Sequence, residues 1–175
     1  MTARHPALRT ALASLGLLAA GLAFGQGAVD AKSAAISRGQ YLARIGGCND
    51  CHTPGYAEKS DSTPVSQWLT GLPVGFQGPW GTSYPANLRL TVQGMTEAQW
   101  IKFARLPRLP PMPWYSLRDM SDADLVALYQ FIRSLGPQGE KMPAAVAPGG
   151  KVTTPFFVFV PQMPAAAGAS KTSSR

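Results

Sequence analysis

The stretch Cys48-Asn49-Asp50-Cys51-His52 contains both cysteines of the 175-residue chain and one of its two histidines. Two thiols at this spacing can form thioethers with the two vinyl groups of a haem, and the adjacent imidazole can then bind the iron. The motif therefore predicts one covalently attached haem c, with Cys48 and Cys51 as its attachment sites and His52 as the proximal iron ligand.

Other chemistries explain this C-x-x-C pair less well. A thioredoxin-like redox pair is expected after a strand in a βαβ unit, which the residues around Cys48 do not indicate. A structural zinc site needs four ligands, more than two cysteines and one histidine provide. A disulfide between Cys48 and Cys51 would leave the neighbouring His52 without a role.

The N-terminus has the order of an export signal. Arg4 and Arg9 form a positive region, and small residues follow the apolar run over residues 10–24. We expect a signal peptide over residues 1–25, a linker over residues 26–33, and a periplasmic mature protein without stable membrane insertion. The alternative is an uncleaved anchor or an interfacial helix, although the run is short for a bilayer span.

Composition limits the fold and the partners. Apolar residues make up 45% of the chain, enough for a modest core, while 18 glycines and 16 prolines predict many loops. Large sheets and long helical bundles therefore fit poorly. The excess of 16 Lys and Arg over 9 Asp and Glu gives a net charge of +7. An exported chain without a binding motif is nevertheless not expected to bind nucleic acid.

Two helices carry clear start signals. A capping box at residues 96–99 predicts a helix that continues to about residue 105. A second start signal at residues 121–124 predicts a longer helix, whose apolar residues fall on one face. A Gly-Pro pair at residues 136–137 is expected to end it.

A third helix is predicted over residues 34–45, where apolar residues follow a helical period up to Gly46-Gly47. Gly39 lies inside this helix at a cost of about 1 kcal/mol relative to Ala, which indicates a close crossing by another element. Residues 53–90 read as irregular, apart from one turn at residues 65–69, because prolines and glycines interrupt every pattern. A large buried cofactor would supply the core in such a segment.

Beyond residue 136 the composition changes to Pro, Ala, Gly, Ser and Lys, which indicates a C-terminal extension over residues 137–175. Its run Pro155–Val160 (PFFVFV) is too apolar for a free tail, so we expect it to dock on the domain as an extended segment. A strand that binds a partner is the alternative. Residues 164–175 are predicted to be disordered.

The sixth iron ligand has to be another residue type, since His52 is the one histidine left after signal cleavage. Met112 is the best candidate because prolines flank it in Pro110-Pro111-Met112-Pro113 and restrict a loop between two helices. Core packing is the alternative role of Met112. The remaining candidates are a lysine side chain and Met95, Met120, Met142 and Met163.

Five segments resemble class I mono-haem cytochrome c domains, most closely those in the cytochrome subunits of periplasmic alcohol and aldehyde dehydrogenases. The segments are Arg38–Leu42, Cys48–His52, Tyr84–Leu88, Pro111–Trp114 and Ser121–Leu135. The resemblance implies a small all-α fold over residues 34–136, with three to four short helices around the haem. It also implies that the first and last helices cross, with Gly39 against Tyr129 or Phe131. Unlike those subunits, the chain has one motif and no anchoring helix at its C-terminus, which favours a carrier.

Several side chains are expected around this haem. His52 should donate its free ring N–H to a backbone carbonyl, for which residues 64–79 are the expected source. The propionates need donors, and the polar and aromatic candidates are Trp80, Tyr84, Asn87 and Arg89. Apolar candidates for the pocket are Leu72, Phe76, Trp80, Leu88, Leu90, Ile101, Leu106 and Leu128.

A closed haem with His and Met ligands predicts a one-electron carrier rather than an enzyme, because a thioether favours Fe(II) and leaves no open iron position. The expected electron donor is a dehydrogenase or a quinol-oxidising complex. One alternative is a gas-binding or sensing haem protein with an open or displaceable sixth position. A peroxidase-like enzyme is a further alternative, but it would lack a distal histidine.

Basic residues flank the Met112 loop and predict a positive collar that steers an acidic redox partner. An ordinary solvated surface is the alternative. We expect a monomer or a loosely associated subunit. The collar residues are Lys102, Arg105, Arg108 and Arg118.

Overall fold

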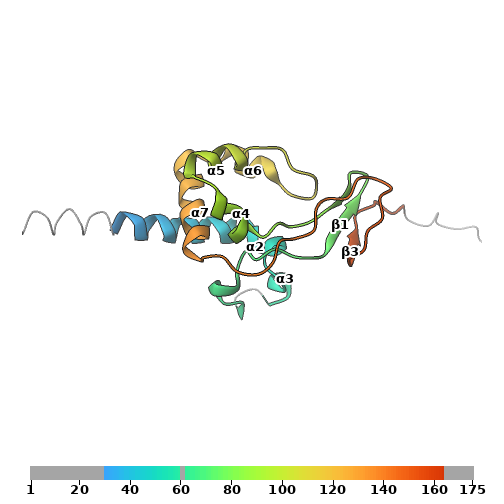
Figure 1. Ribbon diagram of the computed structural model, residues 1–175, viewed down its shortest axis with the longest axis horizontal. Helices are drawn as coiled ribbons and strands as arrows, with labels where there is room; N and C mark the ends of the chain where they lie inside the picture. The colour runs from blue at the N-terminus through green and yellow to red at the C-terminus, as the bar shows by residue number, and fades with distance from the viewer. Residues whose placement is uncertain (1–29, 60–61, 164–175) are drawn as a thin grey trace, which may run out of the picture.

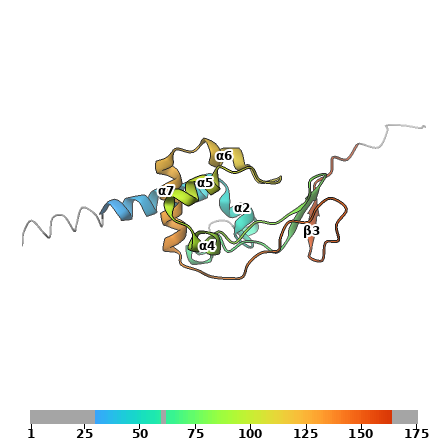
Figure 2. The same cartoon turned by 45° about the horizontal axis from the view of Figure 1, so that its top comes forward.

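The computed structural model describes residues 30–59 and 62–163, so the predicted signal peptide (1–25) and residues 164–175 lie outside the described part (Figure 1). Helix is the main secondary structure of this described part, which confirms the all-α class. The described part contains seven α-helices rather than three to four, and several of them are single turns. Three short strands lie at the opposite end of the molecule from the first helix (Figures 1 and 2).

The first helix covers residues 30–45 and crosses α7 (Asp122–Ser134), as Figures 1 and 2 show. Gly39 is the crossing point, because a Cβ there would meet the carbonyl oxygen of Ala127 and lie 2.6 Å from Phe131 Cβ. Any side chain at residue 39 would therefore overlap α7. The predicted crossing at Gly39 against Phe131 is confirmed.

The first helix starts earlier than the sequence predicts. Residues 30–33, the described part of the predicted linker, are already helical. Ala31 and Lys32 both have high helix propensity, which allows the helix to extend N-terminally beyond the core. Tyr129, the other predicted neighbour of Gly39, instead donates its hydroxyl to the Met95 carbonyl at 2.6 Å.

Side chains cap the two helices whose starts the sequence predicts. Thr96 Oγ1 accepts the N–H of Gln99 at 3.3 Å, and Gln99 Oε1 accepts the N–H of Thr96 at 2.9 Å. This pair confirms the capping box of α5 (Glu97–Ala104). Ser121 Oγ accepts the N–H of Asp124 at 3.1 Å and caps α7 in the same way.

The segment predicted to be irregular, residues 53–90, contains several short elements, so that prediction is wrong except for the expected turn near residue 65. Single helical turns fit between its prolines because they need only three or four residues. The C-x-x-C-H motif is itself helical. The short helices are α2 (Cys48–His52), α3 (Tyr56–Lys59), α4 (Leu88–Thr91) and α6 (Trp114–Asp119), with 3₁₀ turns η2 (Val65–Gln67) and η3 (Val92–Gly94).

A small sheet joins this segment to the C-terminal extension. β1 (Gly75–Gly78) and β2 (Gly81–Ser83) form an antiparallel hairpin. β3 (Phe156–Val158) runs parallel to β1 with Phe157 opposite Phe76, which gives the strand order β2-β1-β3. The predicted docking of the PFFVFV run as an extended segment is therefore confirmed.

The core lies between the first helix, α5, α7 and the turn before β1. Among the described residues, its side chains all precede the extension. None of the described helices is both long and apolar enough to cross a membrane. The buried core residues are Ala43, Trp68, Leu69, Val92, Trp100, Ala104, Leu125, Leu128, Tyr129, Phe131 and Ile132.

Candidate functional site

His52 ends α2 as a buried side chain with 7% of its surface exposed. Its Nδ1 atom lies 2.7 Å from the carbonyl oxygen of Ala86. Burial lowers the pKa of His52, although the bond to Ala86 opposes this shift, so the imidazole is neutral near pH 7. A carbonyl can only accept, so Nδ1 carries the proton and Nε2 keeps a lone pair that can bind a metal ion.

The predicted hydrogen bond from His52 to a backbone carbonyl is confirmed, but its expected source in residues 64–79 is wrong. That stretch contacts the other side of His52, where the N–H of Gly71 donates to the His52 carbonyl at 2.8 Å. The chain then returns, and the N–H of Leu72 donates to the Pro85 carbonyl at 3.1 Å. This return brings Ala86 to the imidazole.

Cys48 and Cys51 are free thiols in the same helix. Burial raises the pKa of Cys48 to about 11 and also raises the pKa of Cys51. Both therefore remain protonated near pH 7, unlike redox-active cysteines, whose pKa values are lowered. In the described ranges, no three His, Cys, Asp or Glu side chains form a group that could hold a metal ion.

These donors fit a covalently bound haem. Two free thiols sit on one helical turn beside a neutral imidazole whose Nδ1 is fixed by a carbonyl. A haem c takes two thioether bonds and one imidazole nitrogen from this sequence motif. Neither a disulfide nor a cluster of further metal ligands competes for these groups in the part of the chain that the structure describes.

A buried polar network behind the motif fixes α2 relative to α4. The Thr53 hydroxyl donates to Asn49 Oδ1 at 2.7 Å and accepts the N–H of Leu69 at 2.8 Å. Leu69 is fully buried in the left-handed region, with φ 63°, and its carbonyl accepts the N–H of Leu88 at 3.0 Å. Sequence analysis misses this network because no periodic pattern distinguishes these residues.

Met112 lies half-buried in the loop between α5 and α6. Its carbonyl accepts the N–H of Trp114 at 2.9 Å, and the Ser83 hydroxyl donates to the Pro110 carbonyl at 2.6 Å. These bonds tie both sides of the loop to neighbouring elements. The role of Met112 as an iron ligand stays a prediction.

The other methionines have different surroundings. Met95 and Met120 are partly buried against the helical core. Met142 lies in the extension, where its Cγ would be 2.6 Å from a Cβ on Gly71. Met163 exposes 89% of its surface. Met112 is the candidate that lies in the loop between α5 and α6.

The four predicted propionate contacts have different partners within the protein. Asn87 caps α4 and Arg89 lies in it, and both donate to Gln138 of the extension. Trp80 Nε1 donates to the Phe76 carbonyl at 3.2 Å. Tyr84 Oη lies 2.7 Å from Thr154 Oγ1. Each group thus has a partner within the protein, and contact with propionates stays a prediction.

Arg89 has a structural role that sequence analysis misses. It exposes 4% of its surface, and its Nε donates to the Gly136 carbonyl at 2.6 Å. One Nη1–H donates to the Ser66 carbonyl at 2.7 Å, and Nη2 donates to the Leu135 carbonyl. The bonds to Leu135 and Gly136 satisfy carbonyl groups at the C-terminal end of α7, which have no partner within the helix.

The predicted apolar pocket residues are divided between two regions. Leu128 belongs to the helical core. The Phe76 ring centroid lies 5.7 Å from that of Phe157 and 5.6 Å from that of Phe159. Trp80 also packs on Phe159, at 6.4 Å. Of the others, Leu106 is exposed, whereas the half-buried ones are Leu72, Leu88, Leu90 and Ile101.

The basic residues around the Met112 loop are partly neutralised. Arg105 Nη2 lies 2.5 Å from Asp122 Oδ1, and Arg118 Nε lies 2.7 Å from Asp119 Oδ1. Lys102 is exposed on α5, and Arg108 stacks over an aromatic ring. The effect of this collar on an acidic partner stays a prediction.

Comparison with known proteins finds a relative among cytochrome subunits. The chain is 30% identical over 131 residues to a Gluconobacter oxydans (strain 621H) protein named "Alcohol dehydrogenase (quinone), cytochrome c subunit". The match covers 68% of this chain and 25% of that protein, so the chain spans about a quarter of its relative. No family model and no solved structure matches the chain. The similarity supports a cytochrome c-like relationship.

Proposed function

We propose that this protein is an exported electron carrier with one covalently bound haem c. Cys48 and Cys51 would hold the haem through thioether bonds, and His52 and Met112 would bind the iron. The haem would supply one-electron exchange between Fe(III) and Fe(II). The observation that carries this proposal is the neutral His52 imidazole, with Nδ1 bonded to Ala86 beside two free thiols.

The side chains have distinct tasks in this proposal. The bond from His52 to Ala86 fixes the plane of the imidazole and increases its basicity toward iron. The Met112 thioether favours Fe(II) and raises the reduction potential. The hydrogen bonds on either side of Met112 limit the entropy lost when its sulfur is held in place.

The electron donor that we propose is a dehydrogenase or a quinol-oxidising complex. The printed name of the relative, a cytochrome c subunit of an alcohol dehydrogenase, supports this choice. Export would follow cleavage after Gly25 and place the protein in the periplasm. The exposed Lys102 and the other collar residues would steer an acidic redox partner, whose association rate should then fall with salt. The carrier would act as a monomer or a loosely associated subunit.

Absorption spectra of the purified exported protein test the proposed ligands. We expect a low-spin haem, the weak far-red band of methionine bound to Fe(III), and no response of the reduced form to carbon monoxide. Met112→Ala should lose the band and bind carbon monoxide. Met163→Ala is the matched control, because that side chain is 89% exposed, and it should behave like the wild type.

Two results would contradict the proposal. Prompt carbon monoxide binding by the wild-type protein would mean an open iron position and would favour a gas-binding protein. An unchanged spectrum in Met112→Ala would assign the sixth position to another residue.

A further inference from the structure

We propose that the C-terminal extension, described over residues 137–163, positions the Ala86 carbonyl that orients His52, and that Asn87 is the positioning residue. The effect on the iron rests on the proposed function. The hydrogen bond between His52 and Ala86 forms within the polypeptide and does not depend on the haem. This positioning gives the extension a role at the site, although its strand β3 lies in the sheet at the other end of the molecule from the first helix (Figure 1).

Asn87 links the extension to α4 through one buried amide. Its Nδ2 donates to the carbonyls of Gln138 at 2.8 Å and Glu140 at 3.1 Å. Its Oδ1 accepts the N–H of Leu90 at 3.1 Å and caps α4. All of these bonds hold the residue that directly follows Ala86.

The extension also packs closely against Asn87 and against Gly71, at two places where the chain contacts His52. A Cβ on Gly139 would lie 3.3 Å from Asn87 Nδ2, so the extension passes directly over this amide. A Cβ on Gly71 would lie 2.6 Å from Met142 Cγ and 2.7 Å from the Asn87 nitrogen. Gly71 is the residue whose N–H donates to the His52 carbonyl at 2.8 Å.

The extension therefore encloses two backbone segments that bind His52, one at its ring and one at its carbonyl. Ala86 is itself exposed, so its own burial does not hold the carbonyl in place. Residues 138–142 of the extension supply that restraint through Asn87 and Gly71. A looser Ala86 carbonyl would weaken the bond to Nδ1 and make the imidazole less basic. A less basic ligand stabilises Fe(III) less, so the reduction potential would rise.

A matched pair of glycine variants in the full chain tests this inference. Gly139 and Gly149 both lie in the extension with positive φ, at 74° and 79°. Valine at either position carries similar backbone strain. Only Gly139→Val crowds Asn87, because nothing lies within 4 Å of a Cβ on Gly149. Asn87→Asp is a second variant, which retains the cap acceptor but loses both donors to the extension.

The readouts are the exchange rate of the His52 Nδ1–H, measured by NMR in the reduced protein, and the reduction potential. Gly139→Val and Asn87→Asp should exchange this proton at least about fivefold faster, as expected when one net hydrogen bond is lost. Gly139→Val should also have a higher reduction potential, whereas Asn87→Asp is judged by proton exchange alone, because its added negative charge itself lowers the potential. Gly149→Val should match the wild type in both readouts.

The inference is wrong if Gly139→Val lowers the unfolding midpoint but leaves both readouts at wild-type values, since the extension would then only stabilise the fold. It is also wrong if Gly149→Val shifts them equally. A full chain that takes up no haem would contradict the proposed function instead. In that case the exchange rate in the haem-free variants still decides whether the extension positions the bond to Ala86.

Discussion

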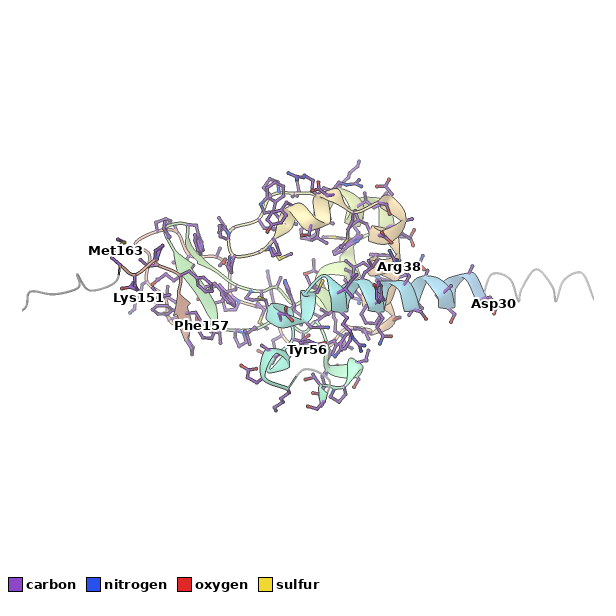
Figure 3. The ribbon with its side chains drawn as sticks, turned by 180° about the vertical axis from the view of Figure 1, so that it is seen from behind. Asp30, Arg38, Tyr56, Lys151, Phe157 and Met163 are labelled. Atoms are coloured by element: carbon purple, nitrogen blue, oxygen red, sulfur yellow. The ribbon has the colours of Figure 1, made fainter. Side chains whose placement is uncertain are left out.

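The helical body and the C-terminal extension are held by different interactions. In the body, core side chains such as Leu125 and Ile132 are completely buried. In the extension, Phe157 and Val158 expose 57% and 61% of their surfaces, although both lie in a strand. Figure 3 shows Phe157 and Lys151 at one end of the molecule and Asp30, at the start of the first helix, at the other.

Backbone hydrogen bonds provide much of what attaches the extension. The N–H of Gly75 donates to the Pro155 carbonyl at 2.8 Å, and the N–H of Phe159 donates to the Gln77 carbonyl at 2.7 Å. Val146 exchanges two further bonds with Thr82. Each such bond contributes only about 1 kcal/mol net, so the extension should open more readily than the body. The protein is therefore expected to combine a tightly packed body with an extension of lower local stability.

The largest expected effect is at the helix crossing of the body. Gly39→Ala would place a Cβ against the Ala127 carbonyl and 2.6 Å from Phe131 Cβ, and the backbone of α7 cannot move without disturbing the core. We expect a loss of about 3 kcal/mol or more in the free energy of unfolding, measured with urea. Gly94→Ala is the control, because a Cβ there has nothing within 4 Å. Equal stability of the two variants would refute the close crossing.

A smaller loss is expected where the body meets the extension. Arg89→Leu removes the donors to the carbonyls of Ser66, Leu135 and Gly136, and leaves these groups without their partner. We expect the free energy of unfolding to fall by about 2 kcal/mol. Arg44→Leu is the control, since this exposed side chain only lies over the Trp68 ring and should cost less than about 1 kcal/mol. Similar losses in both variants would mean that the buried bonds of Arg89 contribute little.

The same Arg89→Leu variant tests the predicted propionate contact. Once the haem is attached, loss of a charged partner should change the reduction potential. An unchanged potential would restrict Arg89 to its structural role.

The next effect concerns the contact between β2 and the extension, which should open without the body unfolding. Gly81→Val would place a Cβ against the Val146 carbonyl and 2.9 Å from the Ala147 carbonyl carbon. Amide exchange at Thr82 and Val146 should accelerate by about tenfold, which corresponds to about 1.4 kcal/mol of local stability. Exchange at core amides such as that of Leu128 should not change. Equal acceleration in the core would mean that the two regions unfold together, which would contradict a lower local stability of the extension.

The smallest expected effect depends on pH and concerns the body alone. Asp124 accepts a hydrogen bond from Arg38 at 2.9 Å, and this bond is the main reason that the pKa of Asp124 is lowered. A lowered pKa in the folded state means that ionised Asp124 stabilises the fold above its unfolded pKa of about 3.9. This contribution disappears as the pH falls through the folded pKa.

The difference in unfolding free energy between the wild type and Asp124→Asn should therefore be constant near neutral pH. It should shrink below about pH 4, where both states become protonated. Urea unfolding between about pH 7 and pH 2 measures it. A difference that does not depend on pH would exclude this ion pair as its cause.

The sequence predicts the body better than the extension, because side-chain patterns determine the body. The capping residues Thr96 and Ser121 mark two helix starts, and an unfavourable glycine at residue 39 marks the crossing. The motif likewise indicates His52 and its need for a carbonyl partner. These signals are local in the sequence, or follow from a residue that would otherwise be unfavourable.

The sequence does not predict the hairpin or the carbonyl that binds His52. β1 begins and ends with glycine, so its residues lack the alternation that indicates a strand. The pairing of β1 with β3 joins residues about 80 positions apart through backbone groups, which every residue type possesses. Ala86 binds His52 through its carbonyl for the same reason, so no side chain identifies it.

The most direct test of the haem site is the intact mass and absorption of the denatured chain. The protein would be purified from a host that exports it. A second C-x-x-C-H protein, produced in the same host, would show that haem attachment works there. We predict that each wild-type chain keeps one haem after denaturation. The Cys48→Ser/Cys51→Ser variant should carry none. A wild-type chain without added haem mass, while the second protein carries its haem, would contradict a covalent haem at α2.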